Sequence, residues 1–415
     1  MELRPYQKEC CNEIEKQESG SYLCRLATGL GKTIIFTHIK RHGRVLVLAH
    51  RDELVHQPIK YYDCKVGVEM ASESSHGEPV VIASVPSLIN RLGKFTPGEF
   101  DTIITDECHH SAAPSYKKIY NYLKPRLHIG FTATPQRPDH VRLDDVFDDI
   151  IYNKDLRWGI KNKYLSDIYC RSVEIGYDLS GIVPKKGEDF NQVQLDAVME
   201  GTDEAVADAY KKYAKGPTII FASSVRHACN IADKIPDAVP ITAQTKNRNS
   251  IIKDFTDGKI PCLTNYMVLT EGVDIPRVET VIIARPTVSN SLYCQMVGRG
   301  LRLYPGKKYL NLIDCSDRSG NPLVCSAPSL LGIDFSDLPG TEKAKLCGNI
   351  SELPVKIEEL TDNPIGWIKN ITRVNLWAKE QKYNTHGIDW YKMPDGKLVC
   401  GLPDKESITI PCEDE

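Results

Sequence analysis

The most informative segment of this sequence is Leu26-Ala27-Thr28-Gly29-Leu30-Gly31-Lys32-Thr33. An apolar run at residues 22–26 leads into it and a run of helical period at 34–39 follows, so a strand, a loop and a helix are expected in that order. In such a loop the residues from Thr28 to Gly31 form a cradle whose backbone N–H groups approach a phosphate, helped by the dipole of the following helix. Lys32 would reach the terminal phosphate oxygens, and Thr33 would offer its hydroxyl to Mg²⁺. The stretch therefore predicts a nucleotide-binding loop in an α/β fold.

A second candidate site is the box Asp106-Glu107-Cys108-His109-His110, which directly follows a buried-strand run at residues 100–105. Parallel sheets bind ligands at the carboxyl ends of their strands. We therefore expect Asp106 to hold Mg²⁺, commonly through water, and Glu107 to orient or deprotonate an attacking water. Taken alone, two carboxylates would also fit a solvated acidic turn. The cysteine and histidines suggest zinc as another alternative, but contiguous residues at a strand end rarely point at one tetrahedral centre.

The β-rich runs form two series along the chain, and in each they alternate with segments of helical period. This rhythm is typical of βαβ units around a parallel sheet. The expected strands are residues 45–49, 80–84, 102–105 and 127–132 in the first series, and 218–221, 261–264, 280–284 and 309–313 in the second. We therefore expect two tandem parallel-sheet lobes, at residues 1–153 and 206–325.

Two segments lack this rhythm. Residues 154–205 are rich in Lys and Asp and suit a connector or small accessory element. Residues 326–415 are expected to form a small α+β accessory tail, with a β-meander between residues 390 and 410. Its tryptophans, Trp367, Trp377 and Trp390, fit either a nucleic-acid surface or the core of a structural or partner-docking module.

Composition narrows the class of protein. Apolar residues make up 41% of the 415 residues and the net charge is −3, so a packed core is expected and any phosphate-binding track must be local. No apolar run approaches the roughly 18 residues that a membrane span needs. The 14 cysteines are irregularly spaced with no Cys-x-x-Cys, which favours reduced thiols. We expect a protein of the cytoplasm, nucleoid or nucleus, possibly virus-encoded, that is neither secreted nor membrane-bound.

Together the loop and the Asp-Glu-Cys-His box resemble motifs I and II of the superfamily-two DEAD/DEAH-type helicases. Upstream, Leu3-Arg4-Pro5-Tyr6-Gln7 is similar to the Q motif of that family, which implies that Gln7 reads adenine. Thr132-Ala133-Thr134-Pro135 resembles motif III. The hydroxyls of Thr132 and Thr134 would then couple the ATP site to the nucleic-acid face.

The second lobe continues the resemblance. Leu269-Thr270-Glu271-Gly272-Val273-Asp274-Ile275-Pro276 resembles motif V, which implies that Gly272 and Asp274 lie at the nucleotide. Gln295-Met296-Val297-Gly298-Arg299-Gly300-Leu301-Arg302 resembles motif VI, which implies catalytic roles for Gln295 and for Arg299 and Arg302 as arginine fingers. Two arginines three apart would share one face of a helix and could both point across the cleft.

Three further stretches resemble the motifs that hold nucleic acid in this family. They are motif Ia at residues 49–54, motif Ib at 82–88 and motif IV at 221–227, which imply contacts from Arg51, Ser84 and Ser223. Loops of this kind bind the phosphate backbone with hydroxyls and backbone amides. Binding is then independent of base sequence and needs no basic net charge.

The resemblance covers residues 3 to about 320 and is nearest to RadD-like and XPB-like DNA helicases and phage relatives. It implies two RecA-like lobes, ATP and Mg²⁺ as cofactors, and ATP-driven translocation or strand separation on nucleic acid, DNA in preference to RNA. The alternatives are a translocase or remodeller that does not unwind, an RNA helicase, and a binding protein with a vestigial nucleotide fold. The last is disfavoured because Lys32, Asp106, Glu107 and both arginines are present. The tail departs from some relatives in lacking zinc-binding cysteines, and a protein partner is its other expected ligand.

Overall fold

The computed structural model describes residues 2–49, 53–133, 143–185, 188–270, 275–316, 324–331, 347–349, 390–392, 398–401 and 407–410. The chain divides into two units, residues 1–353 and 354–415. The first unit contains the two lobes, and the second is described separately below.

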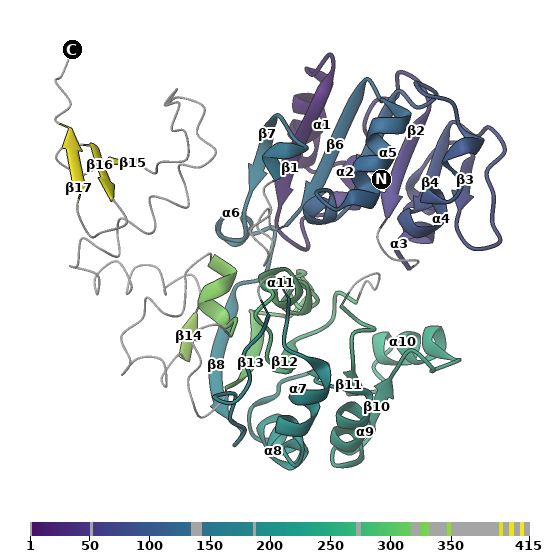
Figure 1. The fold of residues 1–415 in the computed structure, drawn as a ribbon. Helices are drawn as coiled ribbons and strands as arrows, with labels where there is room; N and C mark the ends of the chain where they lie inside the picture. Colours follow the sequence, from purple (N-terminus) through teal and green to yellow (C-terminus); the bar gives the residue numbers. More distant parts are fainter. Residues whose placement is uncertain are drawn as a thin grey trace. The chain divides into compact units, whose positions relative to one another are not determined.

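The first lobe is built on a seven-stranded parallel sheet with the order β3-β4-β2-β5-β6-β1-β7 (Figure 1). Its strands are β1 (Gly20–Leu26), β2 (Val45–Ala49), β3 (Val66–Glu69), β4 (Val80–Ser84), β5 (Thr102–Thr105), β6 (Leu127–Thr132) and β7 (Asp149–Lys154). Every residue of β2, β4, β5 and β6 is buried, which explains why apolar residues predominate in these strands. These four strands have the bounds expected from the sequence.

The second lobe has a sheet of the order β10-β11-β9-β12-β13-β8-β14, parallel except for the edge strand β14. Its strands are β8 (Ile168–Glu174), β9 (Thr218–Ala222), β10 (Ala238–Ile241), β11 (Cys262–Asn265), β12 (Thr280–Ala284), β13 (Leu310–Ser316) and β14 (Cys347–Asn349). The four strands predicted in this lobe are present, with bounds shifted by at most three residues. The expectation of an α/β fold with two parallel-sheet lobes is confirmed.

The segment at residues 154–205 differs from the expected connector. Strand β8 lies inside it and pairs with β13 along its whole length, from Ile168 to Glu174. Polar residues, Arg171, Ser172 and Glu174, interrupt the sequence of β8, and the strand is only partly buried. It therefore lacks the mainly apolar run by which the other parallel strands are recognised. The second lobe therefore begins before residue 206.

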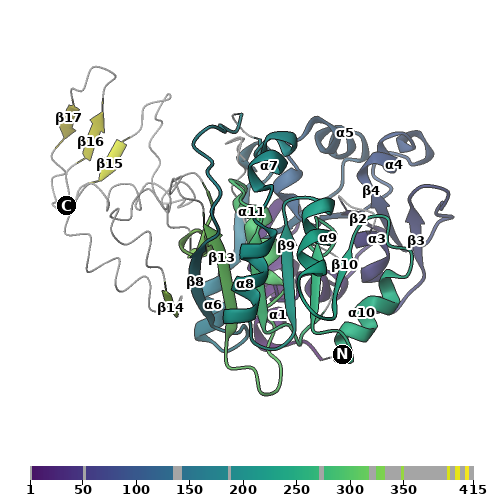
Figure 2. The same cartoon turned by 90° about the horizontal axis from the view of Figure 1, so that it is seen from below.

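Helices cover both sheets. They are α1 (Pro5–Glu15), α2 (Lys32–Thr37), α3 (Glu53–His56), α4 (Val85–Ile89), α5 (Pro114–Leu123), α6 (Leu156–Lys161), α7 (Gln192–Met199), α8 (Asp203–Tyr213), α9 (Val225–Asp233), α10 (Arg248–Thr256) and α11 (Asn290–Gly298). Helices α7, α8 and α9 bury apolar side chains against one face of the second sheet (Figure 2). None of the helices in the described part of the chain is long and apolar enough to cross a membrane.

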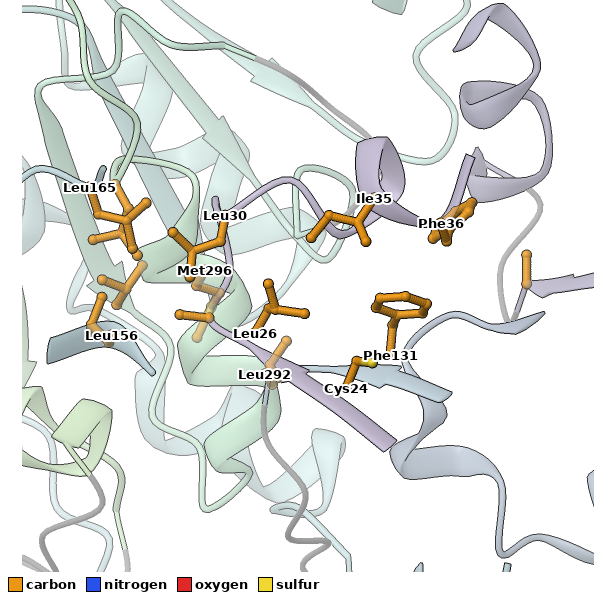
Figure 3. Close-up of a cluster of buried hydrophobic side chains, with 14 of the residues drawn as sticks. Cys24, Leu26, Leu30, Ile35, Phe36, Phe131, Leu156, Leu165, Leu292 and Met296 are labelled. Carbon is orange, nitrogen blue, oxygen red and sulfur yellow. The ribbon is translucent and has the colours of Figure 1, made fainter. Parts of the chain in front are cut away.

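One buried apolar cluster contains residues of both lobes (Figure 3). Leu26 and Leu30 come from the end of β1 and the loop after it, whereas Leu292 and Met296 come from α11 in the second lobe. The phosphate loop (residues 26–33) therefore packs where the two lobes meet.

The second unit contains a three-stranded antiparallel sheet of the order β15-β16-β17. Its strands are β15 (Trp390–Lys392), β16 (Leu398–Gly401) and β17 (Ser407–Ile410). This sheet is the meander expected from the sequence, while Trp367 and Trp377 lie outside the described residues.

Candidate active site

The phosphate loop joins the end of β1 to the start of α2. Gly29 and Gly31 have φ of +92° and +77°, in the left-handed region that favours glycine. A Cβ atom on Gly31 would also lie 2.7 Å from Nε2 of Gln7. The backbone conformation therefore favours glycine at position 31, and a side chain there would also displace the amide of Gln7. Lys32 is the first residue of α2, and Thr33 follows it, as the motif predicts.

The start of α1 is tied to this loop. The Nε2 atom of Gln7 donates to the carbonyl oxygen of Leu30 over 3.3 Å, and the hydroxyl of Tyr6 donates to the same oxygen over 2.8 Å. The Gln7 side-chain oxygen accepts a hydrogen bond of 3.0 Å from the N–H of Arg4. Gln7 is thus buried against the phosphate loop, and its recognition of adenine stays a prediction.

Glu107 forms an ion pair with Lys32. Its Oε1 atom lies 3.2 Å from Nζ of Lys32, and its Oε2 atom lies 3.4 Å from Nδ1 of His109. Burial raises the pKa of the Glu107 carboxyl, but Lys32 and His109 outweigh burial and hold the pKa well below its usual range. The carboxylate is therefore ionised at neutral pH, as a group that orients or deprotonates water must be.

The residues around Glu107 point in different directions. Asp106 is nearly buried at the end of β5, and its Oδ1 atom accepts a hydrogen bond of 3.0 Å from the N–H of Glu107. Cys108 lies in the core, where its Sγ atom would be 2.7 Å from a Cβ atom on Gly130. Because Cys108 packs inward while His109 contacts Glu107, the two side chains diverge, which argues against the zinc alternative.

His109 connects three parts of the site. Its Nδ1 atom lies 3.4 Å from Oγ1 of Thr132 at the end of β6, and its Nε2 atom lies 3.3 Å from Oγ of Ser291 in α11. The box therefore contacts Thr132 in its own lobe and Ser291 in the second lobe through one imidazole. Sequence reasoning did not assign His109 a role and did not single out Ser291. Thr134, the other coupling candidate, lies outside the described residues.

The arginines of motif VI are not on one helix face, so that expectation is wrong. Helix α11 ends at Gly298, Arg299 is its C-cap, and Arg302 lies in the turn beyond it. The helix stops at the glycine, where a Cβ atom would lie 2.3 Å from Cγ2 of Thr28 in the phosphate loop. Gln295 is buried within α11. The structure thus brings the end of motif VI against motif I.

The candidate nucleic-acid residues that the structure describes are both buried. Ser84 donates a hydrogen bond of 3.1 Å to the hydroxyl of Ser87, and the Ser223 hydroxyl lies 2.9 Å from Nδ1 of His227. Both hydroxyls are thus bonded within their own lobes, and their contacts with nucleic acid stay predictions. Three other candidates, Arg51, Gly272 and Asp274, lie outside the described residues.

Fold and site together define a two-lobed nucleotide-binding protein with a phosphate loop, an acidic box and a second-lobe helix that meet in one place. Residues 1–137 match the family model described as type III restriction enzyme, res subunit, and residues 201–304 match the helicase conserved C-terminal domain. These matches confirm the resemblance of the chain to superfamily-two helicases, and its two lobes are RecA-like.

Relatives agree with this assignment. The chain is 34% identical to the putative ATP-dependent helicase IRC3 of Saccharomyces cerevisiae, over 86% of this chain and 58% of the relative. It is 24% identical to the DNA 3'-5' translocase XPB2 of Sulfurisphaera tokodaii, over 73% of this chain and 79% of the relative. The chain thus spans less than two thirds of the yeast protein.

A solved structure supports the fold. A fragment of a putative HsdR subunit of a type I restriction enzyme from Vibrio vulnificus superposes with a TM-score of 0.59. The match covers 81% of this chain and 67% of that one, at 24% identity.

Proposed function

We propose that the protein is an ATP-driven motor on nucleic acid, a helicase or translocase that hydrolyses ATP between its two lobes. One observation carries the proposal: His109 contacts Glu107 in the acidic box and also Ser291 in the second lobe. A change at the nucleotide can therefore alter the position of the second lobe through His109. Such coupling is what converts hydrolysis into cycles of lobe closure.

The residues present fit a nucleotide with Mg²⁺. Thr33 and Asp106 supply a hydroxyl and a carboxylate, the hard oxygen ligands that Mg²⁺ prefers. When bound, the ion neutralises developing charge on the phosphates. Gln7 lies beside the phosphate loop, where its amide suits the donor and acceptor edge of adenine.

The hydrolytic step follows from the charges of this chain. Lys32, which pairs with Glu107 here, exchanges that partner for phosphate oxygens, and this frees the carboxylate to orient and deprotonate the attacking water. Arg299 and Arg302 come from the second lobe and stabilise the charge of the transition state. Such fingers are worth about 10³ to 10⁵ in rate, so hydrolysis is fast only when the lobes are closed.

DNA is the proposed track. One relative is named a DNA translocase, and the first matched family is described as a restriction enzyme subunit. With a net charge of −3 the protein has no global attraction for phosphates, so local loops on the lobes must supply the contacts. The tail at residues 326–415 is the proposed site for a protein partner.

The test is the ATPase rate without polymer and with single-stranded DNA, duplex DNA, forked DNA or single-stranded RNA. We expect stimulation by DNA above that by RNA, and loss of all activity in Lys32→Ala. Stronger stimulation by RNA would support the RNA helicase alternative instead. Activity that survives Lys32→Ala would overturn the motor assignment.

Strand separation is tested separately. A strand-displacement assay on forked DNA is run beside a translocation assay on duplex DNA. Displacement supports a helicase, whereas translocation without displacement supports the alternative of a non-unwinding translocase or remodeller.

A further inference from the structure

Arg302 lies in a turn beyond α11, and the backbone carbonyl oxygens of this turn accept hydrogen bonds from Ser166 and Lys307. The N–H of Ser166 donates to the Leu301 oxygen over 2.8 Å, and the Ser166 hydroxyl donates to the Arg302 oxygen over 3.1 Å. The ammonium group of Lys307 donates to the Arg302 oxygen over 3.0 Å and also to the Gly300 oxygen. All three consecutive carbonyls of the arginine turn (residues 300–302) are therefore bonded from outside the turn.

These donors come from two different parts of the chain. Ser166 lies between α6 and β8, in the segment that joins the two lobes, whereas Lys307 lies between the arginine turn and β13. Ser166 is buried and Lys307 is half-buried. Burial lowers the pKa of Lys307 to about 8, against the opposing effect of Glu279. Withdrawing an ammonium group from water is unfavourable unless it is hydrogen-bonded, and the two carbonyls supply those bonds.

The residue before Ser166 contacts the phosphate loop. A Cβ atom on Gly29 would lie 2.9 Å from Cδ2 of Leu165 and 3.8 Å from Cβ of Leu301. Leu165 is buried in the apolar cluster that also contains Leu30 (Figure 3). Two adjacent residues of the connection between lobes thus touch the phosphate loop and the arginine turn.

Arg302 needs such support because it lies outside the helix. A guanidinium group stabilises a transition state only when it is held in place beforehand, and a shift of about 1 Å can reduce a rate by roughly 10²-fold. Arg299 is fixed by its place at the end of α11, but the position of Arg302 depends on the turn.

We propose that Ser166 and Lys307 are positioning residues for ATP hydrolysis, which hold the arginine turn so that Arg302 reaches the nucleotide. Ser166 also links that turn to the phosphate loop through Leu165. The proposal rests on the proposed ATPase function.

The test measures kcat and KM for ATP with saturating single-stranded DNA in Ser166→Ala, Lys307→Met and Lys307→Arg, each alone and combined with Arg302→Ala. We expect kcat to fall roughly five-fold in Ser166→Ala, the equivalent of one hydrogen bond, and more in Lys307→Met, with KM unchanged. Lys307→Arg should recover most of the rate because it keeps a cation that donates. Lys308→Met, at an exposed neighbouring lysine, is the matched control.

The combined variants decide the mechanism. In the Arg302→Ala background, Ser166→Ala and Lys307→Met should cause no further loss, because the group that they position is gone. Equal losses in both backgrounds, or a change in KM alone, would overturn the proposal. If Lys307→Met does not fold, Ser166→Ala decides the question. Failure of the motor assignment itself is distinguishable, because Lys32→Ala would then keep its activity.

Discussion

Among single residues, Glu107 is the proposed group that acts on the attacking water. Glu107→Gln keeps the shape and a hydrogen-bond acceptor for Lys32 but removes the charge that orients and deprotonates water. We expect ATP binding to be retained and kcat to fall by about 10² to 10⁴, the range for loss of a general base. Fluorescent-nucleotide binding and steady-state ATPase assays measure the two effects. Near wild-type turnover would show that Glu107 does not act on the water.

Buried histidines predict how stability depends on pH. Burial alone lowers the pKa of His128 to about 3, where its ring lies 3.0 Å from the hydroxyl of Thr105. Burial also lowers the pKa of His227 to about 4, although Asp203 opposes this shift. Both imidazoles are neutral in the folded protein but gain protons near pH 6.5 when unfolded. The free energy of unfolding is therefore highest above pH 6.5. It decreases as the pH falls from 6.5 toward the pKa values that the two histidines have in the folded protein.

Between pH 7 and pH 5, each histidine should reduce the free energy of unfolding by about 2 kcal/mol. Urea denaturation at a series of pH values measures how steeply the free energy of unfolding changes with pH. In His128→Gln the part of the slope due to His128 should disappear, and the same change at exposed His76 is the control. An unchanged slope in His128→Gln would contradict the assignment.

At the scale of elements, the end of α11 is set by its contact with the phosphate loop. Gly298→Ala would place a Cβ atom 2.3 Å from Cγ2 of Thr28, a distance that real side chains do not tolerate. Because the two atoms lie in different lobes, the lobes must separate to relieve the clash. We expect the DNA-stimulated ATPase to fall at least about 10-fold, as for other misplaced catalytic groups. Thermal unfolding should change little.

Gly93 supplies the matched control for this substitution. A Cβ atom on Gly93 meets no other atom within 4 Å, so Gly93→Ala should leave the ATPase unaltered. If Gly298→Ala were as active as Gly93→Ala, the contact between α11 and the phosphate loop would have no place in the catalytic cycle.

The elements also show what sequence alone predicts. Strands β2, β4, β5 and β6 were predictable to the residue because both of their faces are buried, so apolar residues predominate in their sequences. Strand β8 was missed because polar residues interrupt it and it is only partly buried. The bonds to the arginine turn were also unpredictable, since Ser166 and Lys307 are far from each other in sequence and belong to no motif. Local pattern thus predicted the motifs that meet at the candidate site, and tertiary packing decided how their residues are held.

For the whole molecule, the polar contact between His109 and Ser291 is one link between the lobes beside the candidate nucleotide site. His109 is placed to transmit the state of Glu107, because its two ring nitrogens contact Thr132 in one lobe and Ser291 in the other. A motor needs this link only for the part of its ATPase that responds to the polymer. Basal hydrolysis should depend on this link less, because the residues proposed to support it, Lys32 and Glu107, both lie in the first lobe.

Ser291→Ala should therefore reduce the stimulation of ATPase by DNA roughly three- to ten-fold, the equivalent of about one hydrogen bond, while basal hydrolysis stays near the wild-type rate. Ser291→Thr keeps the hydroxyl and serves as the matched control. The measurement is the ratio of stimulated to basal kcat, with DNA affinity determined separately by fluorescence anisotropy. If weaker DNA binding explained the loss of stimulation, Ser291 would contribute to DNA binding instead of to the coupling between the lobes. Equal stimulation in both variants would show that the contact between His109 and Ser291 transmits nothing.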